Sequence, residues 1–293
     1  MLSLHTNFAS LSAQNSISNT QSKLSTSMTR LSTGFRVNSA MDDAAGLQIA
    51  TRLKAQTSGM TVAMSNTQNS TSMLQTAEGA FSEVTNMLVR MKDLATQAAD
   101  ASSSLDDRKA MQAEYDALGT ELYNVMTNTT FGGTKLLGDG SASTKGTLST
   151  SMTFQIGASS TEKMSFDVSS NLTSLNAKLT GLSSNFAASS ITNASELTTG
   201  TAANGAIDKL EKAINDVSSI RSALGATANR LDHVNSNLSN ISTNTKAATG
   251  RIMDTDFATE SSNMTASQML LQAGTAMLKQ SNSMSSMVMS LLQ

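Results

Sequence analysis

The stretch LSTGFRVNSAMDDAAG, residues 31–46, decides the fold because helical sequence leads into it and away from it. The helical period fails inside this stretch, and Gly34 can adopt a positive φ that other residues adopt only at a cost. The polar residues after it are short ones that cap helices and bond to nearby backbone, namely Asn38, Ser39, Asp42 and Asp43. We predict a fixed, non-helical joint between two helical regions.

A second stretch of this kind, GRIMDTDFATE at residues 250–260, lies toward the other end of the chain. Helical patterns flank it on both sides. This symmetry predicts that the two ends of the chain run together and bend at the same level.

The composition indicates a protein that associates. The chain has 293 residues, enough for one large domain or two smaller ones, and its net charge is −2. Charged residues make up 14% of it, against about 25% in ordinary soluble domains. A surface poor in charge disperses a monomer badly. We therefore expect self-assembly, and no partner among nucleic acids or anionic membranes.

Several residue types are missing or rare. Cys, Pro and Trp are absent and aromatics make up 3%, which excludes disulfides and thiolate chemistry, permits long unbroken helices and argues against a stacking platform. No apolar run reaches the roughly 18 residues of a membrane span. The start, MLSLHTNFAS, lacks the pattern of a signal peptide for the general secretory route.

Apolar residues recur at helical spacing through most of the chain. Residues 1–33 and 257–293 each carry such a stripe, residues 44–100 predict one or two helices, and residues 105–125 a further helix after a Ser-rich break. A short break makes antiparallel neighbours. The stripe predicted for 44–100 consists of Leu74, Ala77, Phe81, Val84, Leu88, Met91, Ala95 and Ala98. A membrane-surface helix is the alternative for residues 1–33, but it requires Lys and Arg on the polar face.

The middle of the chain changes character. MTFQIG at 152–157 and MSFDVS at 164–169 alternate apolar and polar residues, which predicts a β-hairpin. Residues 171–204 are rich in Ser, Thr and Asn, and we expect an exposed, variable segment there. From residue 205 two adjacent apolar tracks return, which favours a bundle of three or four helices over a two-stranded coil. The fold class is mainly α: a long-helix coiled-coil bundle from paired N- and C-terminal segments, with a small β-hairpin region.

These residues support a resemblance. LSTGFRVNSAMDDAAGLQIA at 31–50, MLVRMKDLATQAA at 87–99, FATESSNMTASQMLLQAGTAML at 257–278 and the final SLLQ are similar to the terminal signatures of bacterial flagellins, in the same order and with the same spacing. The shortness of the middle resembles the lateral, swarming-type flagellins. The resemblance implies an exported, extracellular subunit that polymerises into the hollow filament used for swimming or swarming.

The resemblance also implies a division into domains. Residues 1–42 and 254–293 would form the inner tube, residues 43–175 and 201–253 the outer core with its hairpin near 152–168, and residues 176–200 the short exposed segment. The inner-tube seam is then predicted to contain Leu4, Phe8, Leu11, Leu24, Leu31, Phe257, Met264, Leu271, Leu278, Leu291 and Leu292. The spoke between the shells would consist of Arg30, Gly34, Arg36, Asn38, Asp42, Asp43, Arg251, Asp254 and Asp256. We expect ion pairs, within or between subunits, to fix the spoke, since such pairs set register more surely than they add stability; solvated loop charge is the alternative.

Partners follow from the same resemblance. They are other copies of the chain, an export chaperone at the C-terminal helices, and the filament cap and hook–filament junction proteins. The vertebrate Toll-like receptor for flagellin, Toll-like receptor 5, reads a surface that maps to Arg90, Leu94 and Glu114, with Val89, Met91, Lys92 and Asp93 in the loop of that epitope. Packing between subunits is the alternative role for Met91 and Leu94. Intracellular sensors read the last leucines, although Gln293 departs from the usual final Arg.

The sequence offers little for catalysis or cofactor binding. His5 and His233 are the two histidines and have no partner at ligand spacing, and zinc, P-loop and nucleophile-elbow motifs are absent. We predict a non-enzyme without cofactor or metal. Two rivals to the filament subunit stay open: a hook–filament junction protein, which would form a short ring, and a secreted adhesin or immune ligand, which would act as a monomer.

Overall fold

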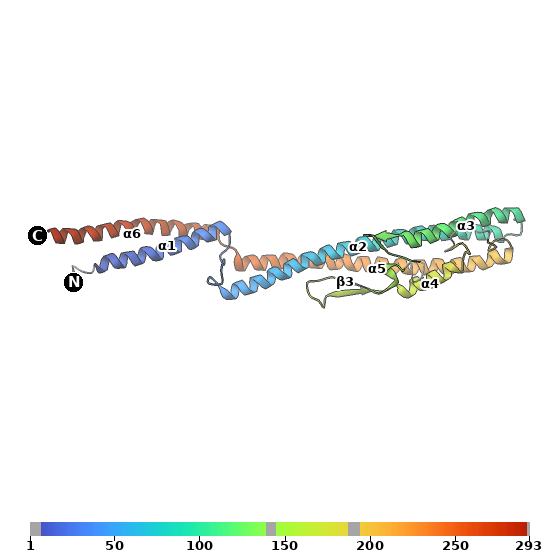
Figure 1. Ribbon diagram of the computed structural model, residues 1–293, viewed down its shortest axis with the longest axis horizontal. Helices are drawn as coiled ribbons and strands as arrows, with labels where there is room; N and C mark the ends of the chain where they lie inside the picture. The colour runs from blue at the N-terminus through green and yellow to red at the C-terminus, as the bar shows by residue number, and fades with distance from the viewer. Residues whose placement is uncertain (1–6, 139–144, 187–193, 292–293) are drawn as a thin grey trace. The chain divides into compact units, whose positions relative to one another are not determined.

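The computed structural model describes residues 7–138, 145–186 and 194–291, with side chains described up to residue 284 (Figure 1). The predicted positions Leu4, Leu291 and Leu292 lie outside the described residues or side chains. In chain order the elements are α1 (Phe8–Thr33), α2 (Ala44–Ala99), α3 (Leu105–Asn128), β1 (Thr130–Phe131), β2 (Thr134–Lys135), η1 (Thr147–Ser149), β3 (Met152–Gln155), β4 (Lys163–Phe166), α4 (Ser169–Thr180), α5 (Gly200–Met253) and α6 (Phe257–Leu291).

The chain divides into two compact units. The first consists of residues 1–57 with 243–293, and the second of residues 58–242. The long helices α2 and α5 each contribute to both units. Because this division reflects contacts inside one chain, the predicted inner-tube and outer-core boundaries of a filament subunit stay a prediction.

In the first unit, α1 and α6 pair in antiparallel directions. The side-chain amide of Asn7 donates to the carbonyl oxygen of Ser281 at 3.3 Å, whereas Arg30, at the other end of α1, lies 3.8 Å from Glu260. Buried and half-buried residues recur every three or four positions on both helices, as in a coiled coil. This α1–α6 seam contains Ser10, Ala13, Ile17, Thr20, Leu24, Ser27 and Leu31 on α1, and Glu260, Met264, Ser267, Leu271, Gly274, Leu278 and Ser281 on α6.

Five of the predicted seam residues therefore lie in the seam of the protomer, namely Leu24, Leu31, Met264, Leu271 and Leu278. Three others do not, because Phe8, Leu11 and Phe257 are exposed. Phe8 and Leu11 fall off the three-and-four track of α1. Phe257 begins α6 at the level where α1 has already turned into the joint.

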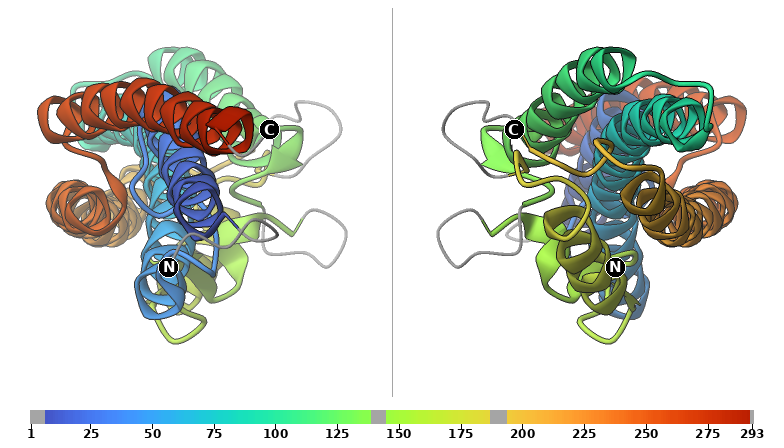
Figure 2. Two further views of the ribbon diagram at one scale, coloured as in Figure 1. Left: turned by 90° about the vertical axis from the view of Figure 1, so that its left-hand side faces the viewer. Right: turned by 90° about the vertical axis from the view of Figure 1, so that its right-hand side faces the viewer.

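The second unit holds the main hydrophobic core. Its helices α2, α3, α4 and α5 run beside one another (Figures 1 and 2). Residues 44–99 form one helix, and all eight residues of the predicted stripe from Leu74 to Ala98 are buried. From α5 the core receives Leu210, Val217, Leu224 and Leu231, which repeat every seven residues. Helix α3 begins directly after the short break, as predicted, and a capping box between Ser104 and Asp107 forms its start.

The predicted β-hairpin is present. β3 and β4 pair in antiparallel register, with Met152 opposite Phe166 and Gln155 opposite Lys163. The hairpin packs closely on α2: a Cβ atom placed on Gly59 would lie 2.7 Å from the Cβ of Ala158. A second pair of short strands, β1 and β2, was not predicted.

The expectation that residues 176–200 are exposed is wrong for their described part. Helix α4 reaches into this segment, and the side chains of Leu179, Leu182, Phe186 and Leu197 are buried. Leu172, Leu175, Leu179 and Leu182 follow one another at three or four residues, which is the spacing of a helix face rather than of a loop. The segment therefore closes the core.

A group of polar side chains, called here the polar clasp, fastens this segment to α3. The side-chain nitrogen of Gln112 donates to Asp116 at 2.8 Å and to Glu196 at 3.0 Å, while the backbone N–H of Leu197 donates to the side-chain oxygen of Gln112 at 2.6 Å. Glu196 also accepts from the backbone and hydroxyl of Ser184. The clasp consists of Gln112, Asp116 and Glu196.

Candidate functional site: the paired joints and the exposed face of the first unit

The two predicted joints lie side by side and hydrogen-bond to each other. Gly34 ends α1 with φ of 75°, in the left-handed region, and its carbonyl accepts from the backbone N–H of Thr255 at 3.0 Å. Phe35 and Asp254 form an isolated antiparallel β-bridge. Arg36 donates to Met253 and Ile252 from its backbone and guanidinium, at 2.6 and 2.9 Å. The shared bend predicted from the sequence is therefore a backbone-to-backbone junction.

The first joint is also braced from within. A carboxylate oxygen of Asp42 accepts from the backbone N–H groups of Asn38 and Ser39 at 3.1 and 2.9 Å and from the Ser39 hydroxyl at 3.1 Å. The backbone bond from Ser39, the largest cause, and the other two bonds hold the pKa of Asp42 below its ordinary value. The side-chain amide of Asn38 donates to the carbonyl of Phe35 at 2.7 Å. These bonds fix residues 35–42 in one conformation.

Carboxylates start the helices that leave the joints. Asp43 accepts from the backbone N–H of Gly46 at 2.8 Å and so caps α2. A side chain at Gly46 would collide with that carboxylate, which explains why glycine occupies this position. Asp256 caps α6 by accepting from Thr259 and Ala258, and its pKa is lowered first by the Thr259 hydroxyl and then by the backbone donors.

Within the described part of the protomer, Arg36, Asp42 and Asp43 do not form the ion pairs that were predicted for the joint. Arg36, Asp42 and Asp43 bond to backbone groups, which they reach because the joint has few internal helical bonds. Among the described residues of the joints, the ion pair present joins Arg30 to Glu260, a residue that the sequence did not single out. Glu260 is buried in the α1–α6 seam, and its i,i+4 spacing to Met264 was the available signal. Arg251 and Asp254 are exposed, and ion pairs between subunits stay a prediction.

Exposed large apolar side chains gather on the first unit. Of the fifteen found among the described residues, eleven belong to it, although it is the smaller unit. They are Phe8, Leu11, Met28, Phe35, Met41, Ile49, Phe257, Met269, Leu270, Met277 and Met284. Met41, in the middle of the braced joint, is 97% exposed. Apolar exposure on this scale marks an interaction surface.

The residues of the expected receptor epitope separate into two groups. All of them except Glu114 lie in helix α2 rather than in a loop. Arg90 and Glu114 are partly exposed and form an ion pair at 2.7 Å, and Lys92 lies 3.7 Å from Glu211. Val89 and Asp93 are exposed.

Met91 and Leu94, by contrast, are 1% and 2% exposed and belong to the core of the second unit. The expectation that they face a receptor or another subunit is therefore wrong for this fold. They pack inside their own protomer because they lie on the buried face of α2.

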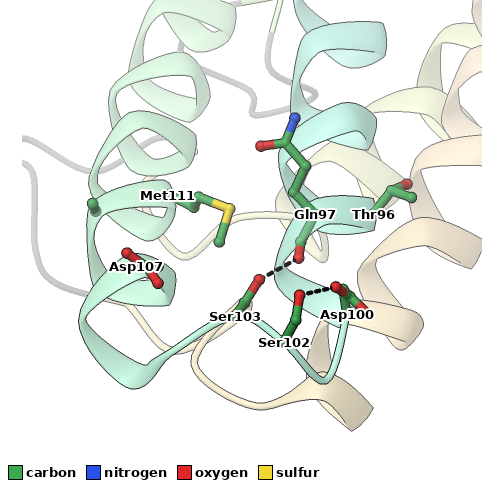
Figure 3. A pocket seen from close by; sticks show the side chains of 8 residues that line it. Thr96, Gln97, Asp100, Ser102, Ser103, Asp107 and Met111 are labelled. Carbon is green, nitrogen blue, oxygen red and sulfur yellow. Dashed lines mark hydrogen bonds between the residues drawn. The ribbon is translucent and has the colours of Figure 1, made fainter.

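An open pocket lies where α2 turns into α3 (Figure 3). Its polar groups form hydrogen bonds within the turn: the Ser103 hydroxyl donates to the carbonyl of Gln97 at 2.8 Å, and the Ser102 hydroxyl donates to the carboxylate of Asp100. In the described parts of the chain, no three His, Cys, Asp or Glu side chains gather as a metal site would require. None of the described helices combines the length and apolar character that crossing a membrane demands.

Comparison with known proteins agrees with this architecture. Residues 4–142 match the family model of the bacterial flagellin N-terminal helical region, and residues 207–292 match that of the C-terminal helical region. Flagellin A of Vibrio anguillarum is 34% identical over the whole of both chains, and polar flagellin C of Vibrio parahaemolyticus is 33% identical, also over the whole of both. The alignment with flagellin A runs over 393 positions, so that relative carries sequence with no counterpart in these 293 residues.

A solved structure from Vibrio parahaemolyticus, described as a flagellar hook-associated protein, has a TM-score of 0.55 and 16% identity, covering 73% of this chain and all of that one. At this identity the likeness concerns the fold alone. Family models and full-length relatives go further: the protein belongs to the bacterial flagellins, the structural subunits of the extracellular flagellar filament.

Proposed function

We propose that the first unit drives polymerisation by burying its exposed apolar side chains against other copies, and that the paired joints act as the spoke between an inner tube and an outer shell. The observation that carries this proposal is the concentration of exposed apolar residues on the first unit. Eleven such side chains in one small unit are a liability for a monomer and a driving force for a polymer.

The distribution of the core supports the same conclusion. The main cluster of buried apolar residues runs from Leu74 to Leu231, entirely within the second unit. In the described part of the first unit, the buried large apolar side chains are Leu24 and Val37. A unit that buries so little gains stability from neighbours, at about 25 cal/mol per Å² of apolar surface removed from water.

The joints suit the role of a spoke because their geometry is fixed by many bonds to backbone. A glycine in the left-handed region, a β-bridge and capping carboxylates on both sides hold the bend. The fully exposed side chain of Met41 is presented from this rigid loop, where holding it in place costs little additional entropy on binding.

Seeded polymerisation of the full chain tests the proposal. Leu270→Gln places a polar side chain on the exposed face of α6 and should slow elongation from filament seeds at least tenfold. Leu105→Gln makes the same change at a residue of the second unit with a similar exposure, 59% against 62%, and should elongate at the wild-type rate. Electron microscopy and pelleting measure both. Equal elongation by the two variants would contradict a role for the first unit.

The hook–filament junction protein is the alternative that the sequence left open, and the hook-associated structure shares the fold of this chain without favouring that function. The same experiment separates the two. Long tubes of the width of the seeds are expected for a filament subunit, whereas short stubs that stop after one ring would support the junction protein.

The proposal also includes an export chaperone, the cap and junction proteins, and a host receptor as partners. Exposed apolar residues on α6 would offer an export chaperone a surface to cover, and the inner-tube ends would contact the cap and junction proteins. For Toll-like receptor 5, the pair Arg90–Glu114 offers a guanidinium and a carboxylate on a rigid surface. Arg90→Ala should weaken receptor binding in a pull-down with the receptor ectodomain, while Lys109→Ala, in an exposed pair elsewhere on α3, should not. As a member of a family of structural proteins, the chain is proposed to have no catalytic activity.

A further inference from the structure

Three threonines on α1 turn their hydroxyls back onto the helix that carries them. The side-chain oxygens of Thr26, Thr29 and Thr33 donate to the carbonyl oxygens four residues earlier, at 3.1, 3.0 and 2.9 Å. All three residues are exposed. Their spacing of three and four places them on one face of the helix, outside the α1–α6 seam. We call this face the threonine stripe.

The stripe is polar in sequence but behaves as a row of methyl groups. The Cβ of threonine carries a hydroxyl and a methyl, so a hydroxyl that bonds to its own helix leaves the methyl on the outer side. Burying an unbonded hydroxyl is costly, whereas a hydroxyl already bonded inside the helix loses little when water leaves. The stripe can therefore be covered by an apolar surface without a new polar partner.

A complementary row lies on α6. Leu270, Met277 and Met284 repeat every seven residues, and all three are exposed. On the same face, the small residue Ala273 lies between Leu270 and Met277, and Ala266 lies one turn before Leu270; both are also exposed. None of these five residues belongs to the α1–α6 seam. Large side chains at heptad spacing insert between small ones in helix–helix contacts.

We propose that the threonine stripe of one copy receives this α6 row of another copy in the filament. The inference rests on polymerisation through the first unit, and it names the surface that α1 contributes. Both rows are free of charge, so neither needs an ionic partner. The α1 of the same chain cannot supply the contact, because the stripe lies on the exposed face of α1 that is turned away from the α1–α6 seam. Arg30 lies at Glu260 and Ile17 at Gly274, so Thr29 is also about 9 residues, or roughly 13 Å, along the helix pair from Leu270, the nearest large side chain of the row.

Two matched variants test the chemistry. Thr26→Val with Thr29→Val keeps the shape and both methyls but removes the hydroxyls, and Thr26→Ser with Thr29→Ser keeps the hydroxyls but removes the methyls. Thr33 is left unchanged because its oxygen also accepts from the backbone N–H of Phe35. The critical concentration for elongation should stay within about twofold for the Val variant and rise about tenfold for the Ser variant, since two buried methyls are lost per subunit.

The outcomes are distinct. If the wild-type chain does not elongate, polymerisation itself fails as the function. If the wild type elongates and both variants match it, water covers the stripe and the inference is overturned. If Val prevents elongation and Ser does not, the hydroxyls make polar contacts between copies, which also overturns it.

Pairs of introduced cysteines test whether α6 of a second copy covers the stripe. The natural chain contains no Cys, so a disulfide can form only between the introduced positions. Thr29→Cys is combined in turn with Leu270→Cys, Met277→Cys and Met284→Cys, and assembled filaments are oxidised. At least one pair should yield disulfide-linked dimers on a non-reducing gel, and these must join two chains since all three positions lie too far along α6 for a bond within one chain. Thr29→Cys with Lys279→Cys, about 200° around α6 from Met277, is the control. Linkage in the control alone, or in no pair, would overturn the assignment of a second copy.

Discussion

Replacing Gln112 by Leu should destabilise the second unit severely, although the two side chains have nearly the same volume. Gln112 is buried in α3 and makes three hydrogen bonds in the polar clasp: it donates to Asp116 and Glu196 and accepts from the backbone of Leu197. Leucine can make none of them. Two carboxylates then face each other without the donor between them, and the N–H of Leu197 loses its acceptor.

The magnitude follows from these three losses. A buried donor left without a partner costs about 1–3 kcal/mol, and a hydrogen bond to a charged group contributes about 1.5–3 kcal/mol. Because Glu196 is half-exposed and can turn partly toward water, the losses do not add fully. We expect the free energy of unfolding to fall by about 3–5 kcal/mol, near the upper end of what single substitutions do.

The assay exploits the tyrosines. The chain has no Trp and two Tyr, and both Tyr115 and Tyr123 lie in α3, so tyrosine emission reports the unfolding of the second unit alone. Urea unfolding at pH 7 gives the free energy from the midpoint and the slope. Gln97→Leu, the same change at an exposed position of α2, should shift it by less than about 0.5 kcal/mol. A loss below about 1 kcal/mol in Gln112→Leu, with an unchanged slope, would refute the reasoning.

Three further predictions concern pH and backbone. Hydrogen bonds lower the pKa of Asp256 in the folded protein. The stability that its charge contributes is therefore present above the pKa of the unfolded chain, about 3.9, and is lost as the pH falls through the lower pKa of the folded protein. Filaments of the Asp256→Asn variant should show a smaller difference in stability between pH 5 and pH 3 than wild-type filaments, as measured by pelleting. Burial, together with the charges of Glu196 and Asp116, raises the pKa of Tyr115. The neutral phenol therefore stabilises the fold up to about pH 10, the pKa of an unfolded tyrosine, and this contribution is lost at higher pH. Absorbance at 295 nm should show that this phenol ionises only as the second unit unfolds. Gly225→Ala, in the interior of α5 with open space around the new Cβ, should stabilise the protomer by about 0.5–1 kcal/mol in the urea assay, and a loss of stability would contradict the geometry.

The sequence predicts best where one pattern is sustained. The stripe from Leu74 to Ala98 keeps its spacing of three and four over seven turns, and every member is buried. The same stripe included Met91, whereas the resemblance placed Met91 and its neighbour Leu94 on a receptor-facing surface. Periodicity was the better guide here, because burial depends on the helix face and a receptor epitope is assigned by alignment of residues.

Tertiary polar networks are what the sequence could not predict. Gln112 and Glu196 are 84 residues apart, and nothing local marks either as a partner of the other. The joint shows the intermediate case. Its glycine and its short polar residues were sufficient to predict a fixed bend, but whether Asp42 bonds to an arginine or to the backbone depends on the conformation of residues 38–42.

The α1–α6 seam itself argues that the first unit is built to be completed by other copies. Several of its inward positions are small or polar, including Ser10, Ser27 and Ser267, and a charged residue, Glu260, lies at one end. Such a seam aligns two helices but contributes less free energy than one of Leu and Ile. Contacts that form only between copies add their free energy to the folded state by mass action. The pairing of α1 with α6 should thus strengthen with protein concentration and with filament growth, while the second unit, with its own core, should keep its stability in the monomer.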